Sequence, residues 1–300
     1  MRKQTRNIIS GYLLILPALL LIFLILVYPL IQTVLLSLQE VKLASLSRQT
    51  FVGLKNYLTI FTFQGPGFFT QVLPATFYFV GGSIAGQLGF GLAIALLVNQ
   101  KWVRGKDIFR AIFILPWVTS AIVIAISWRF MYEPRLGVLN YLLVLFGAVN
   151  LPSWLNDLNL VMPCLVIANV WHGTAFSFTL QTAGLQSIPY ELYEAATVDG
   201  AGAGQKFRYV TLPLIRPFIM INLVLISMYT VNFFDLIYAM TGGGPLYRTE
   251  VIAVFLYHQA FEYGYMGRGA AVAVLILLIN LLLTLLYMRL NRERVAEQKR

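Results

Sequence analysis

The side chains that could perform catalysis are few in this sequence and lie far apart. The two histidines, His172 and His258, are separated by 86 positions, and the single cysteine, Cys164, lies within an apolar run. A metal site, or a nucleophile paired with a base, needs several such groups in one cluster. We therefore expect no catalytic residue, no bound metal and no disulfide within this chain.

A polar segment at residues 187–217 suggests a different kind of chemistry, the docking of another protein. It is a long charge-bearing stretch between two apolar runs. We expect Ser187 to cap a first short helix, which ends at Gly200. A second short helix is expected at residues 204–210 and should end before Pro213, because the residue that precedes a proline is disfavoured in the helical conformation. The segment should therefore form a compact helix-turn-helix.

The order of residues in this segment resembles the "EAA" coupling loop of permease subunits in binding-protein-dependent ABC importers. The residues that carry the resemblance are Glu194, Ala195, Ala196, Asp199, Gly200, Phe207, Val210, Leu212, Pro213 and Pro217. In that family the loop docks in a groove of the ATPase subunit. The resemblance implies that Glu194 anchors the loop, that the two alanines permit close docking and that Gly200 sets the turn. The alternative is that these residues serve only to fold a loop, and alanine is in any case a strong helix former.

The composition of the whole chain indicates a membrane protein. Hydrophobic residues make up 59% of the sequence and charged residues 11%, and the mean hydropathy is +0.75. This leaves too little polar surface for a soluble globular protein. The net charge of +10 is carried by short groups of basic residues beside apolar runs, so we interpret it as a topology signal and expect lipid, not nucleic acid, as the surrounding partner.

Six apolar runs are long enough to cross a bilayer as helices. The predicted spans lie at about residues 8–36, 72–98, 111–131, 159–185, 214–240 and 270–288. The first run is too long for the apolar core of a cleaved signal peptide, which has about 7 to 15 residues. The expected fold class is an all-α integral membrane protein with three regions. These are an N-terminal helix with an outer loop (1–71), a core of five helices that includes the coupling loop at 187–213 (72–290), and a tail (291–300).

The distribution of basic residues predicts the orientation. If both termini are cytoplasmic, 15 of the 22 lysines and arginines lie in cytoplasmic segments. Cytoplasmic loops normally carry this excess. The coupling segment at residues 187–213 then also faces the cytoplasm, where ATP is available.

A second stretch makes the resemblance more specific. Residues 234–245, with the sequence Phe-Asp-Leu-Ile-Tyr-Ala-Met-Thr-Gly-Gly-Gly-Pro, resemble the signature of maltose- and glycerol-phosphate-type permeases, in particular the first of two paired sugar permeases. The resemblance covers essentially residues 10–290 and implies the type I ABC importer permease fold in a bacterial cytoplasmic (inner) membrane. It also implies a second homologous permease, two ATP-binding-cassette subunits and an extracytoplasmic solute-binding protein as partners. Because the sequence lacks a G-x-x-x-x-G-K-[ST] motif, ATP and Mg²⁺ are expected at the partner ATPases and no cofactor on this chain.

The same family suggests where a solute would pass. The corresponding positions here are Trp117, Ala121, Trp171, His172, Gly173, Tyr229, Thr230 and Phe233. Aromatic faces with a few hydrogen-bonding groups suit sugar rings. Tryptophan and tyrosine are also enriched at membrane interfaces, so each is equally explained as an anchor or core residue. His172 stands where the resemblance leads us to expect an apolar side chain, which leaves the solute open.

Two functions from different classes follow. The first is the transmembrane subunit of an ATP-driven importer for a carbohydrate, such as an oligosaccharide, a polyol or glycerol phosphate. The alternative is an ion-coupled secondary transporter, which usually carries acids or bases within its spans and an internal repeat. Neither feature is clear in this sequence. An intramembrane enzyme is disfavoured by the two distant histidines.

Overall fold

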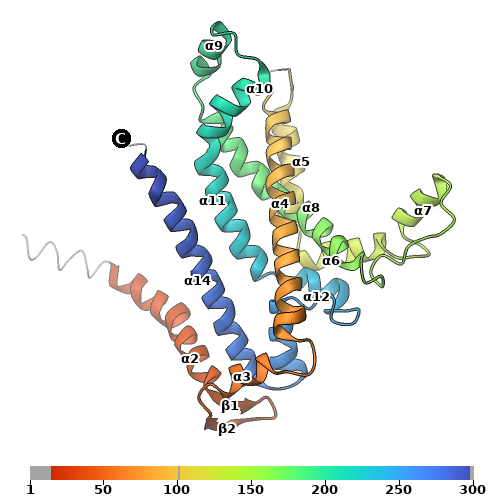
Figure 1. Ribbon diagram of the computed structural model, residues 1–300, viewed down its shortest axis with the longest axis vertical. Coiled ribbons are helices and arrows are strands. Elements are labelled where there is room, and N and C mark those ends of the chain that lie inside the picture. Colours follow the sequence, from red (N-terminus) through yellow and green to blue (C-terminus); the bar gives the residue numbers. More distant parts are fainter. Residues whose placement is uncertain (1–14, 101, 298–300) are drawn as a thin grey trace, which may run out of the picture. The chain divides into compact units, whose positions relative to one another are not determined.

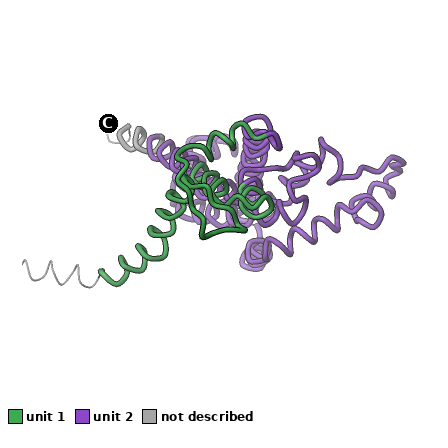
Figure 2. Tube along the Cα trace, turned by 90° about the horizontal axis from the view of Figure 1, so that it is seen from below, with its two compact units in different colours: residues 1–63, 256–277 green, residues 64–255, 278–300 purple. Residues whose placement is uncertain are grey.

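The computed structural model describes residues 15–100 and 102–297, so the predictions for the first fourteen residues lie outside the described part. The described chain is helical apart from one two-stranded sheet (Figure 1). It divides into two compact units, one formed by Met1–Phe63 with Leu256–Leu277 and the other by Gln64–Phe255 with Leu278–Arg300 (Figure 2).

Within the described residues, five helices are long and apolar enough to span a membrane: Ile15–Ser37, Phe68–Val98, Val161–Gln186, Ala203–Val231 and Met266–Arg289. A sixth span is formed only if α5 (Lys106–Val118) and α6 (Ala121–Met131) are counted together, because they meet at an angle of 94°. The first span includes a π-helical turn, η1 (Phe23–Val27), and α2 (Tyr28–Ser37); the last is the greater part of α14 (Met266–Glu297). The predicted helical membrane fold is confirmed, with the two-stranded sheet outside these spans.

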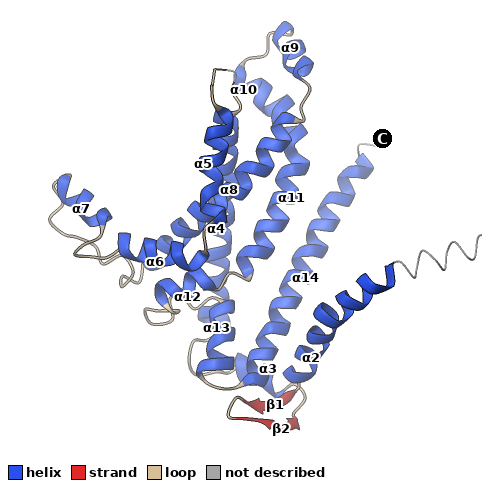
Figure 3. Cartoon of the chain, turned by 180° about the vertical axis from the view of Figure 1, so that it is seen from behind, coloured by secondary structure: helices blue, strands red, loops and turns tan. Residues whose placement is uncertain are grey.

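The smaller unit contains the outer loop predicted after the first span. Strands β1 (Gln39–Lys42) and β2 (Ser45–Phe51) form an antiparallel hairpin, followed by α3 (Lys55–Phe61) (Figure 3). The buried side chain of Asn56 holds these elements together, since its Nδ2 donates to the carbonyl oxygens of Ser37 and Gln39, both at 2.8 Å. The unit also contains η4 (His258–Glu262) and the start of α14.

In the larger unit, α4 (Leu73–Val98, preceded by η2, Phe68–Val72) packs along α8 (Val161–Gln186). Small residues let the two helices approach. A Cβ atom added at Gly91 would lie 2.6 Å from Cβ of Ser177, while one added at Gly89 would meet nothing within 4 Å. Close contact at a small residue thus packs α4 against α8 on the face that carries Gly91.

The remaining elements of this unit are α7 (Val138–Leu145), α9 (Tyr190–Val198), α10 (Ala203–Lys206), η3 (Phe207–Thr211), α11 (Leu212–Val231), α12 (Asp235–Thr241) and most of α13 (Ile252–Tyr257). The largest core cluster joins α4, α6, α8 and α12, with Phe79, Leu165, Leu236 and Ile237 at its centre. The pair α9 and α10 lies at one end of the bundle of α4, α8 and α11, and α12 lies toward the other (Figure 1).

The predicted third span, residues 111–131, is wrong as a single helix. Pro116 lies in the last turn of α5, where it removes a backbone donor and crowds the preceding turn. Thr119 and Ser120 then take extended backbone conformations, with ψ near 137° and 134°. The chain turns sharply at these two residues.

The predicted fifth span, residues 214–240, is also wrong at both ends. The helix runs over Ala203–Val231, and α12 is a separate short helix. At the break, the side-chain Nδ2 of Asn232 donates to the carbonyl oxygen of Met228 at 2.6 Å. Asparagine side chains compete in this way with the backbone bonds that would continue a helix.

Candidate functional site

The turn after α9 has the geometry that the sequence predicts. Gly200 has a φ of +76°, a conformation that costs other L-residues about 1–2 kcal/mol. Its N–H donates to the carbonyl of Thr197 at 3.0 Å, and the N–H of Ala201 donates to the carbonyl of Ala196 at 2.8 Å. These two bonds are the pair that defines a Schellman motif. Asp199 is the last residue before this glycine, so the predicted end of the first helix is confirmed.

The predicted start of α9 is wrong. Pro189, not Ser187, precedes the first helical residue, and no side chain caps it. The hydroxyl of Ser187 instead donates to the carbonyl of Gly184 at 2.8 Å and so belongs to the end of α8.

The predicted stop before Pro213 is wrong as well, because α10, η3 and α11 form one continuous helix. In η3 the N–H of Leu212 donates to the carbonyl of Phe207, five residues earlier. This wider π-helical turn accommodates Pro213, whose missing N–H and bulky ring would disrupt an ordinary α-helical turn. Leu212 and Pro213 are therefore helical residues near the start of α11.

Side chains brace α9 against the helix that follows. The Nζ of Lys206 donates to Oγ1 of Thr197 at 2.9 Å, and the hydroxyls of Tyr193 and Thr211 lie 2.9 Å apart. Their partners are 9 and 18 positions distant in the chain, which explains why the sequence analysis missed all four. We call α9, the Gly200 turn and the braced start of the next helix the coupling knob (residues 190–211).

The coupling knob presents an exposed, mixed surface. Glu194 and Ala195 are exposed and Ala196 is half-buried. Val198, which the sequence analysis did not select, has 88% of its surface exposed. Tyr190, Leu192 and Tyr209 of the knob are also exposed, and exposed apolar surface of this kind can contact another protein.

Four of the eight predicted solute-contacting residues lie close together in the structure. The structure brings His172, Tyr229 and Phe233 together: the rings of His172 and Phe233 stack, with centroids 5.6 Å apart, and Tyr229 lies 5.1 Å from Phe233. Tyr229 is half-exposed, whereas His172 and Phe233 are buried. Thr230 is buried beside them on α11. We call these four residues the aromatic cluster.

The two predicted tryptophans contact other aromatic residues. Trp117 packs against Phe176, with ring centroids 5.7 Å apart, and Trp171 lies 6.2 Å from Trp128. Both predicted tryptophans are about half exposed. Ala121 is the first residue of α6, directly after the bend.

Gly173 has a packing role in the structure. A Cβ atom added there would overlap the side-chain amide of Gln87. The Nε2 of Gln87 donates to the carbonyl of Asn169 at 3.2 Å, and Nδ2 of Asn169 donates to Ser83 at 2.8 Å. Polar side chains thus line the contact between α4 and α8, a feature that the apolar composition of these helices concealed.

Several buried polar atoms near the aromatic cluster have no hydrogen-bond partner among the described residues. They include Nδ1 of His172 and Oγ1 of Thr230. Buried polar atoms normally have partners in the protein or in ordered water. These atoms can therefore bind ordered water.

The sequence is similar to one family of membrane transport proteins. A family model described as "Binding-protein-dependent transport system inner membrane component" matches residues 87–295. The trehalose/maltose transport system permease protein MalF of Thermococcus litoralis is 34% identical over 284 residues, covering 95% of this chain and 94% of that protein. The probable ABC transporter permease protein YurN of Bacillus subtilis is 38% identical over 289 residues, covering 95% and 96%.

Among solved structures, a chain of a bacterial ABC transporter involved in the import of the acidic polysaccharide alginate has a TM-score of 0.82 to this chain. The match covers 97% of this chain and 98% of that one at 23% sequence identity, so it is a likeness of fold.

Proposed function

The chain belongs to the family of inner membrane components of binding-protein-dependent transport systems, and from this we propose that it is the permease subunit of a carbohydrate importer. The observation that carries the mechanism is the continuous helix Ala203–Val231. One end of this helix belongs to the coupling knob, and the other end carries Tyr229 and Thr230 of the aromatic cluster. With a rise of 1.5 Å per residue, it connects points about 40 Å apart.

A rigid helix suits the transmission of an ATP-driven movement. The bracing bonds of Lys206 and Tyr193 fix α9 to the start of this helix. A displacement of the docked knob is then passed to the aromatic cluster as a rigid-body movement and is not absorbed by a flexible loop. The driving force lies in contacts that differ between the two states of the ATPase. In this proposal Glu194, Ala195, Ala196 and Val198 contact the ATPase.

The proposed solute is a carbohydrate. The aromatic cluster combines ring faces with unpartnered polar atoms, which together match the faces and hydroxyl groups of a sugar. The names of the relatives agree, since one is a trehalose/maltose permease and the transporter of similar fold imports alginate. Family membership favours this function over an ion-coupled secondary transporter.

The proposed assembly contains a second permease, two ATP-binding-cassette subunits and a solute-binding protein outside the membrane. ATP and Mg²⁺ bind at the ATPase subunits, and this chain performs no chemistry on the solute. Both termini face the cytoplasm, as the excess of basic residues in the predicted cytoplasmic segments supports. The end of the larger unit that contains α12 then faces outward.

The test is gentle purification of the chain from its native membrane, followed by mass spectrometry of the proteins bound in stoichiometric amounts. We expect a second permease, an ATPase with a Walker motif and a solute-binding protein. The binding protein would then be screened against neutral and acidic sugars to identify the solute. Recovery of the chain alone, or as a homo-oligomer even after mild crosslinking, would refute the proposal.

A further inference from the structure

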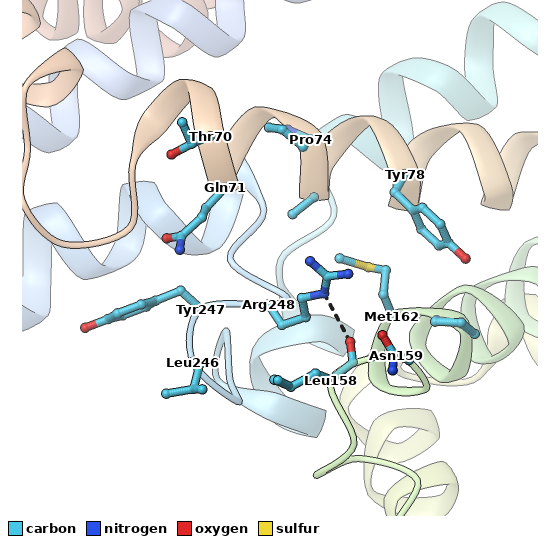
Figure 4. Close-up of a pocket in the computed structure, with 12 residues that line it drawn as sticks. Thr70, Gln71, Pro74, Tyr78, Leu158, Asn159, Met162, Leu246, Tyr247 and Arg248 are labelled. Atoms are coloured by element: carbon cyan, nitrogen blue, oxygen red, sulfur yellow. Dashed lines mark hydrogen bonds between the residues drawn. The ribbon is translucent and has the colours of Figure 1, made fainter.

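A cavity of about 600 Å³ lies at the α12 end of the larger unit, apart from the aromatic cluster (Figure 4). Its walls come from η2 and the first turns of α4, from the start of α8 and from the loop after α12. Gln71, Tyr78, Asn159, Met162, Tyr247 and Arg248 are among the residues that line it. Sites for small molecules have volumes of this order.

The loop after α12, which forms one wall of the cavity, has an unusual backbone. Leu246 and Tyr247 have φ angles of +48° and +60°, which residues other than glycine, asparagine and aspartate rarely adopt. The loop is held in this form by Thr249, whose hydroxyl donates to the carbonyl of Gly244 at 2.7 Å, and by a 2.9 Å bond from the N–H of Arg248 to the carbonyl of Pro245. Backbone strain of this kind concentrates at ligand-binding sites.

The strained loop places one cation in the cavity. The guanidinium of Arg248 extends into the space between α4 and α8 (Figure 4). Its Nε donates to the carbonyl of Leu158 at 3.0 Å, which fixes the plane of the group. The two terminal nitrogens have no hydrogen bond or ion pair with the described residues, and the described lining includes no aspartate or glutamate. Such a fixed, planar donor pair matches two oxygens of a carboxylate, sulfonate or phosphate.

The other lining groups fit a sugar ring. Tyr78 and Tyr247 lie on opposite sides of the guanidinium (Figure 4) and offer aromatic faces, and the amides of Gln71 and Asn159 can exchange hydrogen bonds with hydroxyl groups. We propose that this cavity binds an anionic carbohydrate, with its oxyanion on Arg248 and its ring beside one of the two tyrosines. The presence of carbohydrate at this face rests on the function proposed above, whereas the preference for negative charge comes from the cavity.

The test uses the purified importer complex in phosphatidylcholine nanodiscs, without its solute-binding protein. Binding of glucuronate, glucose and inorganic phosphate is measured by saturation-transfer NMR titration. We expect saturable binding of glucuronate and binding at least about tenfold weaker for both glucose and phosphate, because each lacks one of the two recognised features. Arg248→Gln should weaken glucuronate binding by about tenfold or more. Arg135→Gln, which removes another exposed arginine of the same unit that does not line the cavity, should leave it unchanged.

Three results would overturn the inference. In the first, glucuronate binds Arg248→Gln as well as the unchanged protein. In the second, phosphate alone matches glucuronate, which would make the cavity a simple anion site. In the third, phosphatidylglycerol added to the nanodiscs displaces glucuronate, which would make a lipid headgroup the occupant. If Arg248→Gln fails to assemble, Arg248→Lys keeps the charge without the planar fork, and it should weaken binding several-fold.

Uptake by the same purified complex, reconstituted in proteoliposomes with its solute-binding protein, separates this inference from the proposed function. Proteoliposomes that take up the carbohydrate delivered by the binding protein, but whose complex shows no Arg248-dependent binding of glucuronate, refute the cavity site alone. Arg248-dependent binding without uptake of any carbohydrate supports the cavity site and refutes the importer function.

Discussion

A single methyl group added at Gly200 of the coupling knob should uncouple ATP hydrolysis from solute uptake. Gly200 has a φ of +76°, and a Cβ atom there would meet nothing within 4 Å. The whole effect of Gly200→Ala is therefore in the backbone, where an L-residue in this conformation costs about 1–2 kcal/mol. That free energy corresponds to a factor of roughly 5–30 in the population of the Schellman turn relative to other turn conformations.

The chain offers a matched control for this variant. A Cβ atom added at Gly204 also meets nothing within 4 Å, but Gly204 lies in α10 without a positive φ. Alanine is favoured over glycine in helices, so Gly204→Ala should be neutral or slightly stabilising. The two variants add the same methyl group to the same coupling knob, four residues apart.

The assay is a reconstituted complex in which solute uptake and ATP hydrolysis are measured together. We expect Gly200→Ala to assemble normally and to lower solute uptake per ATP hydrolysed, with the population factor of about 5–30 as the upper limit of the loss. Gly204→Ala should behave like the unchanged protein. The reasoning is refuted if Gly200→Ala transports normally, if both variants lose the same activity, or if Gly200→Ala never reaches the complex and therefore acts only on folding.

Three further predictions test packing, bracing and the aromatic cluster. Gly91→Ala should lower the unfolding free energy by about 1–3 kcal/mol, because its methyl group meets α8. Gly89→Ala, whose methyl group meets nothing, should not lower it. Equal melting temperatures for the two variants would contradict this packing. Tyr193→Phe removes the 2.9 Å hydroxyl contact to η3 and should lower the unfolding free energy by about 1 kcal/mol. It should also lower solute uptake more than ATPase activity. A proportional loss of uptake and ATPase activity would argue against a bracing role. His172→Phe keeps the ring stacked on Phe233 but removes Nδ1, so it should lose part of the uptake. His172→Ala loses the ring as well and should lose several-fold more, since such stacking contributes about 0.5–1.5 kcal/mol; similar uptake by the two would exclude the stack as the feature that matters.

Local chemistry and composition, which can be read from the chain alone, predicted the class of protein and much of the coupling segment. Apolar runs of sufficient length indicate membrane helices whatever their neighbours are. Gly200 ends α9 because its conformation is one that glycine adopts at little cost. These properties depend on residues within one or two turns of each other.

Only the tertiary structure decided where the helices bend or continue and which side chains meet. Pro116 and Pro213 are both prolines in apolar segments, yet α5 ends just after the first while the helix continues through the second. A π-helical turn directly precedes Pro213, and the helix also continues through Pro217, so a proline alone does not predict where a helix ends. Likewise, the contact of His172 with Phe233 and the hydrogen bond from Arg248 to Leu158 join residues 61 and 90 positions apart in the chain. Such contacts are set by the packing of whole helices, so they appear only when the chain is folded.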